Sequence, residues 1–345
     1  MDELARRPIV YLKEISPVAW EHPADRAALS ALRQIPGFDE LLRQIIGQTT
    51  ERALRLLTLA SAVRVNGNQF PRIYSLYCEA ASRLDIGQLP ELFIAQSPFL
   101  NAGAVGVDKP FIILNSSLLK DLGELEIMAV LGHELGHCAS GHALYRTLLW
   151  ILVSIPFMFI NIPLAQIALR LVALALLEWS RKSELSADRA GLLAVQSPEA
   201  CYTLKMKLSG GSEIGQMNLN EFFRQAQDYE GSPDFLDSLF KLANLSQETH
   251  PFPVLRLLEL KKWVDAGAYS KILAGEYIRR GDKSEDDLDS AFKQAQKQYS
   301  EELKMSSDPL AEAVNKVIEN IEQVTKQLND FLGNLFGSGN KEERS

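Results

Sequence analysis

The first residues that suggest chemistry are histidines: three of the chain's five fall within the stretch LGHELGHCASGH, which ends at His142. His133 and His137 are four residues apart, so an α-helix places both side chains on one face. Two neutral imidazoles at this spacing can bind one Zn²⁺ through Zn–N bonds of ~2.0–2.1 Å. Glu134 lies about 100° around the helix and can act as a general base on the attacking water. The HExxH pattern therefore predicts the centre of a zinc-dependent hydrolytic site.

The third histidine of the stretch, His142, does not complete this set in a simple way. It follows His137 by five residues, which in a continuous helix is ~140° around and off the shared face. The extended motif HExxHxxGxxH requires glycine at 140 and histidine at 143, whereas this chain has Ser140 and Ala143. We therefore predict a capping or packing role for His142 rather than ligation.

A catalytic zinc needs a third protein ligand and one open position, and the stretch SRKSELSADRAG at 180–191 offers the best candidate, Glu184. Asp188 lies one turn later on the same face and can hydrogen-bond the far nitrogen of a ligating histidine. Glu178 competes as a ligand but lies on a different face of this helix. The predicted site is one Zn²⁺ per chain, bound by His133, His137 and Glu184.

These residues need elements to position them, and hydrophobic periodicity predicts an α+β, mainly helical fold with a small antiparallel sheet. One long helix is expected to carry the HExxH motif and another to carry Glu184 and Asp188. The expected helices cover 24–66 (interrupted at Pro36-Gly37), 70–84, 123–149 and 178–196, and the expected strands cover 91–96 and 110–117.

The chain divides into three predicted regions. A helical region covers residues 1–66, a catalytic domain covers 67–265, and a helical region covers 266–345. Within the last region, apolar residues of 310–332 follow a heptad pattern, which predicts an amphipathic helix followed by a polar tail. We expect this helix to pack on the domain or on a partner helix, including a second copy of the chain.

Residues 147–177 form a strongly apolar run in which Arg170 is the only charged residue. A membrane-spanning helix needs ~20 apolar residues, and Pro156 and Pro163 interrupt the run near its middle. The sequence leaves two interpretations open. The run is either a membrane hairpin or a helical hairpin buried in the core, inserted between the two zinc-binding helices.

Four motifs, in this order, resemble the M48 metallopeptidases, the family of the HtpX heat-shock proteases and the CAAX prenyl protease. They are NAGA at 101–104, HELGH at 133–137, ELSAD at 184–188 and HPFPVLR at 250–256, and the resemblance covers roughly residues 70–265. The chain departs from the family pattern at Gly103, where an aromatic residue is common, and in the residues after Pro251.

The resemblance implies a zincin-like metallopeptidase domain with an edge strand ahead of the zinc helix. It implies that Asn101 and His250 help to hold the substrate or the oxyanion and that Arg256 orders the site. Several family members place membrane helices between the two zinc-binding helices, which favours a membrane-associated protein. Arg146, Arg181 and Lys182 flank the apolar run, so the active site would face the cytoplasm; the alternative is a soluble cytoplasmic protein.

Composition narrows the function classes further. The net charge of -8 predicts no nucleic-acid partner, and three scattered cysteines predict no disulfide framework. We therefore expect a zinc-dependent endopeptidase that acts on peptide or protein substrates, with a role in membrane protein quality control. Two alternatives stay open: a catalytically retired assembly factor that keeps its zinc site, and a protease specific for prenylated or lipidated peptides.

Overall fold

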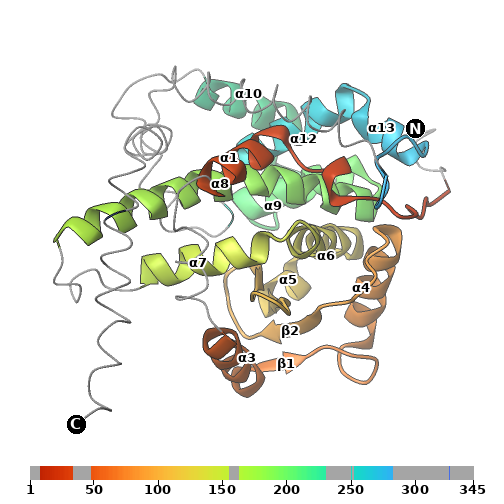
Figure 1. Ribbon diagram of the computed structural model, residues 1–345. Coiled ribbons are helices and arrows are strands. Elements are labelled where there is room, and N and C mark those ends of the chain that lie inside the picture. Colours follow the sequence, from red (N-terminus) through yellow and green to blue (C-terminus); the bar gives the residue numbers. More distant parts are fainter. Residues whose placement is uncertain are drawn as a thin grey trace, which may run out of the picture.

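Two packed helices, α6 (Glu124–Ala139) and α8 (Pro163–Val195), run through the middle of the molecule and carry the HExxH and ExxxD motifs. The computed structural model describes residues 8–33, 48–154, 163–230, 250, 252–282 and 326. In Figure 1, the sheet lies on one side of α6, and α8, α9 and α12 lie on the other. The two metal-motif helices are therefore central, with a layer of secondary structure on each side.

Glycines set the distance between α6 and α8. A Cβ atom on Gly132 would lie 2.3 Å from Cβ of Ala194, and one on Gly136 would lie 2.6 Å from Cβ of Ala190. From the opposite helix, a Cβ atom on Gly191 would lie 2.7 Å from the carbonyl oxygen of Ala129. Because real Cβ atoms do not approach so closely, larger residues would push the helices apart. The glycines thus let the two motif faces meet.

The sheet is mixed, with strand order β1-β2-β4-β3. Its strands are β1 (Ala62–Arg64), β2 (Glu91–Ala95), β3 (Ala102–Val105) and β4 (Phe111–Asn115). The predicted antiparallel pairing of 91–96 with 110–117 is wrong, because β2 and β4 run parallel from Glu91↔Phe111 to Ala95↔Asn115. The reason is β3, which lies between β2 and β4 in the sequence and pairs antiparallel with β4. The chain reverses at β3 and reverses again before β4, so β4 has the same direction as β2.

The remaining helices surround this centre. They are α1 (Pro23–Arg33), α3 (Gln48–Ser61), α4 (Pro71–Arg83), α5 (Ser116–Asp121), α7 (His142–Ser154), α9 (Pro198–Gly210), α10 (Leu219–Glu230), α12 (Pro253–Asp265) and α13 (Ala268–Leu273). Short 3₁₀ turns cover Pro17–Ala19 and Ile214–Gln216. The fold is mainly helical with a small mixed sheet, as the α+β prediction required apart from the strand directions.

Two predicted helices differ from the structure. The single helix expected over 123–149 is two helices, because Gly141 adopts a left-handed φ of 70° between α6 and α7. The interrupted helical region expected over 24–66 contains α1 and α3, but its last residues form β1; the predicted break at Pro36-Gly37 lies in 34–47, outside the described part of the chain. The break at Gly141 matters for the site because it redirects His142.

The apolar run 147–177 is helical at both ends, where it forms parts of α7 and α8, and these two helices pack against each other. Residues 155–162, which would form the turn of the predicted hairpin, lie outside the described residues. Among the helices that the structure describes, none combines the length and apolar character needed to cross a bilayer. The predicted amphipathic helix 310–332 also lies outside the described residues, apart from Lys326.

The first residues described pack into the same core as the catalytic region. Leu12, Ile15 and Trp20 are each buried with 0–1% exposure and belong to one apolar cluster with residues of α4 and α6. The backbone N–H of Ser16 donates to the carbonyl oxygen of Ile278. The N-terminal residues thus pack on the catalytic region and pair with the backbone at Ile278. The domain boundaries at 66 and 265 stay a prediction.

Substituting Gly191 by alanine tests the close helix contact. Alanine normally favours a helix over glycine by up to about 1 kcal/mol, but here the new methyl group meets backbone at 2.7 Å. We therefore expect Gly191→Ala to lower the free energy of unfolding by about 1–3 kcal/mol in urea titrations. Gly215→Ala is the control, since nothing lies within 4 Å of its Cβ position. Equal stability of the two variants would contradict the packing argument.

Candidate metal centre

Three side chains converge where α6 faces α8. Nε2 of His133 lies 3.1 Å from Nε2 of His137 and 3.4 Å from a carboxylate oxygen of Glu184, and His137 Nε2 lies 3.2 Å from the other oxygen. In a tetrahedral zinc site with bonds of 2.0–2.2 Å, neighbouring ligand atoms are about 3.3 Å apart. The three predicted ligands thus already have the spacing that a zinc ion requires.

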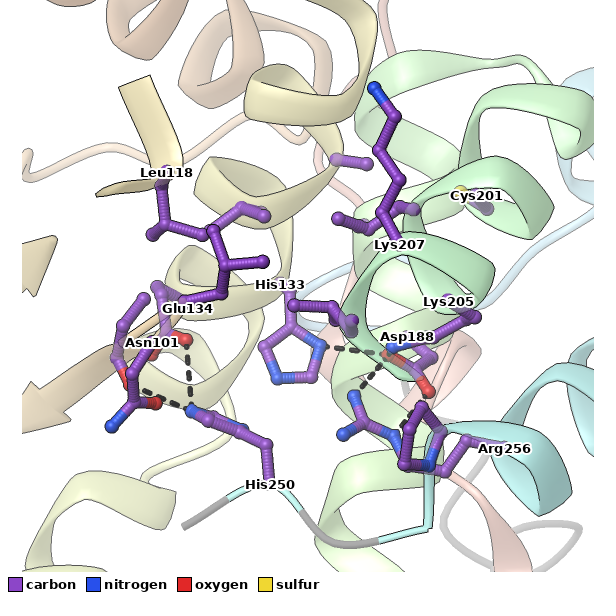
Figure 2. Close-up of a pocket in the computed structure, with 18 of the residues that line it drawn as sticks. Asn101, Leu118, His133, Glu134, Asp188, Cys201, Lys205, Lys207, His250 and Arg256 are labelled. Atoms are coloured by element: carbon purple, nitrogen blue, oxygen red, sulfur yellow. Dashed lines mark hydrogen bonds and ion pairs between the residues drawn. The ribbon is translucent and has the colours of Figure 1, made fainter. Parts of the chain in front are cut away.

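His250 joins this group, since one donor atom from each of the four residues lies within 4.8 Å of the others. Its Nδ1 is 2.7 Å from Glu184 Oε2, and its Nε2 is 2.7 Å from the carbonyl oxygen of Ala102. The same Nε2 lies 3.6 Å from Glu134 Oε1. His250 therefore contacts the predicted ligand Glu184 and strand β3, and Figure 2 shows its ring beside the predicted base Glu134.

Glu134 is 1% exposed and points into the space beside His250. Its Oε2 atom is buried and has no hydrogen-bond partner within the described part of the chain. A buried carboxylate oxygen without a partner is costly and is usually satisfied by water or a ligand. This orphaned oxygen, next to three metal-type donors, fits a site built for a metal and a water.

Asp188 is the centre of a buried ionic network. Its carboxylate is 3.0 Å from His133 Nδ1, accepts two hydrogen bonds from Arg256 at 2.8 and 2.6 Å, and accepts one from Lys205 Nζ at 2.6 Å. Arg256 Nη1 also lies 2.8 Å from Glu184. The structure thus places Asp188 and Arg256 next to the predicted ligands, as the sequence analysis expected.

Two cations of the site were missed by the sequence analysis. Lys205 projects from α9 and is 3% exposed, although nothing in the pattern YTLKMKL marks it as buried. Arg146 was used only to orient the apolar run, yet its guanidinium donates to Glu184 and lies 3.2 Å from His137 Nε2. Spacing along one helix could not reveal either residue, because both partners lie on other elements.

The charges explain the protonation states. Burial alone would raise the pKa of Glu184, but His250, Arg256 and Arg146 hold that pKa well below its ordinary value. Burial opposes ionisation of Asp188 too, and Arg256 and Lys205 hold its pKa well below the ordinary value. Burial and the nearby Arg146 lower the pKa of His137, so its ring is neutral at physiological pH. His137 and Glu184 are thus in the forms that bind zinc, whereas burial would lower the pKa of His133 but its hydrogen bonds to Asp188 and Glu184 raise it.

The two rejected ligand candidates lie elsewhere. His142 does not join the four-residue cluster; its Nδ1 contacts the far nitrogen of His137 at 3.0 Å. Its packing role was expected, but the geometry behind that prediction was wrong because α7 is a separate helix. Glu178 is buried and pairs with Arg181 and Lys182 outside the cluster.

A cavity of about 760 Å³ opens beside His133 and Glu134. Asn101 lines it just before β3, with His250 beside it, whereas Arg256 lies on the far side of His133 (Figure 2). The wall beyond the site includes the apolar residues Leu118, Ala129, Val130, Leu204 and Leu208. The cavity is therefore large enough for several residues of an extended chain and has an apolar wall next to the predicted base.

A helix with an HExxH motif, packed on a helix that supplies a carboxylate, defines a metallopeptidase site. The sequence profile of peptidase family M48 matches residues 68–264, and the chain belongs to this family and is a metallopeptidase. All of the positions discussed above between Asn101 and Arg256 lie inside this match.

Relatives carry names that agree with the family. The plastoglobule-localized metallopeptidase 48, chloroplastic, of Arabidopsis thaliana is 35% identical over 272 residues, which cover 77% of this chain and 78% of the relative. A protease HtpX homolog of Tropheryma whipplei is 28% identical over 188 residues, covering 46% of this chain and 63% of the relative. Protease HtpX of Shewanella pealeana is 42% identical over 64 residues, 18% and 22% of the two chains. No solved structure matches significantly.

Asp188→Asn tests the buried network in metal-free protein. The amide leaves Lys205 buried without its counter-charge and Arg256 paired with Glu184 alone, so we expect a loss of about 3–5 kcal/mol of unfolding free energy at pH 7. The pKa of Asp188 in the folded protein is lower than its ordinary 3.8. The ionised carboxylate therefore stabilises the folded state above about pH 4, and this stabilisation is lost as the pH falls through the folded-state pKa. The difference between wild type and variant should therefore shrink as the pH falls below about 4.

Asp265→Asn is the matched control, since Asp265 pairs with Lys261 at the surface. Exposed pairs of this kind contribute about 0–1 kcal/mol. Urea unfolding in the presence of a chelator measures both variants. A loss of less than about 1 kcal/mol for Asp188→Asn would show that the network is not held by this charge.

Proposed function

We propose that the protein is a zinc-dependent endopeptidase in which His133, His137 and Glu184 hold the ion. The observation that carries the proposal is the spacing of their donor atoms, 3.1–3.4 Å apart, which fits tetrahedral zinc. Asp188 supports it by its contact with the far nitrogen of His133, because such contacts orient a ligating ring.

Zn²⁺, when bound, supplies Lewis-acid chemistry that acidifies water and polarises a carbonyl group. The other steps belong to side chains of this chain. Glu134 takes the proton of the attacking water with its unpartnered carboxylate oxygen and then passes it to the leaving amine. His250 and Asn101, which border the same cavity, stabilise the negative oxygen that forms on the scissile carbonyl. Arg256 keeps Glu184 and Asp188 in place.

The substrate binds in an extended conformation beside β3, an edge strand of the sheet. The hydrogen bond from Asn115 N to Asn101 O sets the alternation of the β3–β4 ladder. The backbone groups of Ala102 therefore point away from β4. Its carbonyl oxygen contacts His250, and its N–H is the backbone partner for the substrate at the cavity. The resemblance implied an edge strand ahead of the zinc helix, and this strand is β3, whereas β4 is an inner strand.

Membrane association, with the site facing the cytoplasm and a role in membrane protein quality control, stays a prediction that rests on the apolar run 147–177. The flanking cations do not support the orientation further, because Arg146 contacts Glu184 and Arg181 contacts Glu178. Extraction of membranes with alkaline carbonate tests the membrane association: a protein anchored by the run stays in the pellet, and a soluble protein is released.

The alternatives predict different results for the same protein. A retired assembly factor would bind zinc but cleave nothing, and its function would depend on 310–332, outside the described residues. A protease for prenylated peptides would cleave only lipid-bearing substrates. The unpartnered Oε2 atom of Glu134, beside the proposed ligands, favours an active peptidase, because a purely structural site has no use for a base.

Glu134→Gln tests the assigned base. The amide cannot accept the proton, so we expect kcat/KM for an unstructured protein such as casein to fall at least about 100-fold. Zinc content, measured by atomic absorption, should stay at one per chain, because Glu134 is not a ligand. Glu184→Gln is the comparison and should lose zinc. An active Glu134→Gln variant with full zinc content would refute the mechanism.

Ala102→Pro tests substrate pairing at β3. Proline removes the N–H that faces the cavity but is tolerated at the first residue of a strand. Losing one backbone hydrogen bond of about 0.5–1.5 kcal/mol should raise KM roughly 2- to 12-fold with a smaller change in kcat. Ala102→Ser keeps the N–H and is the control. If both variants have the same KM and melting temperature as the wild type, the substrate does not pair there.

A further inference from the structure

His137 has a partner on each of its ring nitrogens. Nε2 faces His133 and Glu184 in the cluster, and Nδ1 lies 3.0 Å from Nδ1 of His142. His142 is 1% exposed, so this contact is shielded from water. The break at Gly141 makes the contact possible, because it lets the first residue of α7 turn back toward α6.

The far side of His142 is held by the N-terminal helix α1. Nε2 of His142 lies 3.0 Å from Oδ2 of Asp25, which is also 1% exposed. Two residues of α8 complete the shell of Asp25: Trp179 Nε1 donates at 2.9 Å and Ser186 Oγ donates at 2.5 Å. A buried chain of hydrogen bonds thus runs from Asp25 through His142 to His137.

The chemistry of the donors fixes the protons along this chain. Arg146 Nη1 can only donate a hydrogen bond and lies 3.2 Å from His137 Nε2, so that nitrogen is an acceptor and the proton of the neutral His137 ring lies on Nδ1. Nδ1 of His142 then accepts the hydrogen bond from His137, and His142 carries its own proton on Nε2, next to Asp25. This leaves the lone pair of His137 on Nε2, where it faces the cluster. The opposite tautomer would place a proton where the metal binds.

We propose that Asp25 and His142 are positioning residues that hold His137 in the orientation and tautomer needed for zinc. Helix α1 is therefore a part of the metal centre, although it lies outside the 68–264 region that matches the family. The inference rests on the proposed role of His137 as a ligand. The packing of α1 against α8 places Asp25 there, and the backbone N–H of His22 donates to Ser186 on the same side.

Three variants of the full-length chain test this. His142→Phe keeps a ring but removes the acceptor. His142→Asn places an amide oxygen near the Nδ1 position and restores an acceptor. In Asp25→Asn the amide oxygen is held at the Oδ1 position by Trp179 Nε1, which can only donate, so the NH₂ group faces His142 and reverses the tautomers along the chain. Glu178→Gln is the control, a buried carboxylate of α8 whose partners lie outside the cluster.

The first readout is zinc affinity, measured by competition with a chromophoric chelator. We expect His142→Phe and Asp25→Asn to raise the zinc dissociation constant about 10- to 100-fold, with His142→Asn and Glu178→Gln close to the wild type. The second readout is the visible spectrum of the Co²⁺ form, which should change only in the first two variants. Urea unfolding of the metal-free proteins verifies that each variant is folded.

Each outcome decides between the claims. Wild-type zinc affinity in both His142→Phe and Asp25→Asn, with affinity lost in His137→Ala, would overturn this inference and leave the proposed function intact. Equal losses in His142→Phe and His142→Asn would also overturn it, since the effect would then come from ring volume. Unchanged zinc affinity in His137→Ala would overturn the proposed ligand set itself. If His142→Phe does not fold, Asp25→Asn and its control decide.

Discussion

The close approach of α6 and α8 is the constraint on which the rest of the structure depends. Gly132 and Gly136, one turn apart on α6, face a glycine and two alanines of α8. The distances between them leave no room for larger side chains. Only at this separation do imidazoles from α6 and the carboxylates of Glu184 and Asp188 reach one another. The glycines in LGHELGH therefore serve the chemistry as directly as the histidines, although they touch no ligand.

Bringing two carboxylates into the interior has an electrostatic cost, which the surrounding elements offset with cations. Helix α12 supplies Arg256, α9 supplies Lys205 and α7 supplies Arg146, so three of the helices packed around the pair each contribute one positive charge. Removing one partner of a buried ion pair is more harmful than removing both. The site and the helices around it therefore depend on each other, and the metal centre extends well beyond the HExxH helix.

The sequence predicted the parts of this site that lie close together along the chain. HExxH and ExxxD are periodic on one helix each, so spacing alone identified their shared faces. The cations could not be found in this way, since a lysine in an ordinary helix shows no partner on another element. His142 was placed wrongly because one left-handed glycine ended the helix. The strand directions were missed because the strand at 102–105 was expected only from the family resemblance, and its effect on the direction of β4 was not considered. Residues 34–47 and most of 283–345 lie outside the described part of the chain, so the structure predicted for them stays a prediction.

The most direct test of the central claim, that His133, His137 and Glu184 bind one zinc, is X-ray absorption at the zinc edge of the purified protein. The account predicts one tightly bound zinc per chain, two imidazole nitrogens and only oxygen besides, at about 2.0–2.2 Å with no sulfur. Replacing His137 by alanine should remove one imidazole from the spectrum or release the zinc. A sulfur ligand, or an unchanged spectrum in that variant, would show that the zinc binds elsewhere.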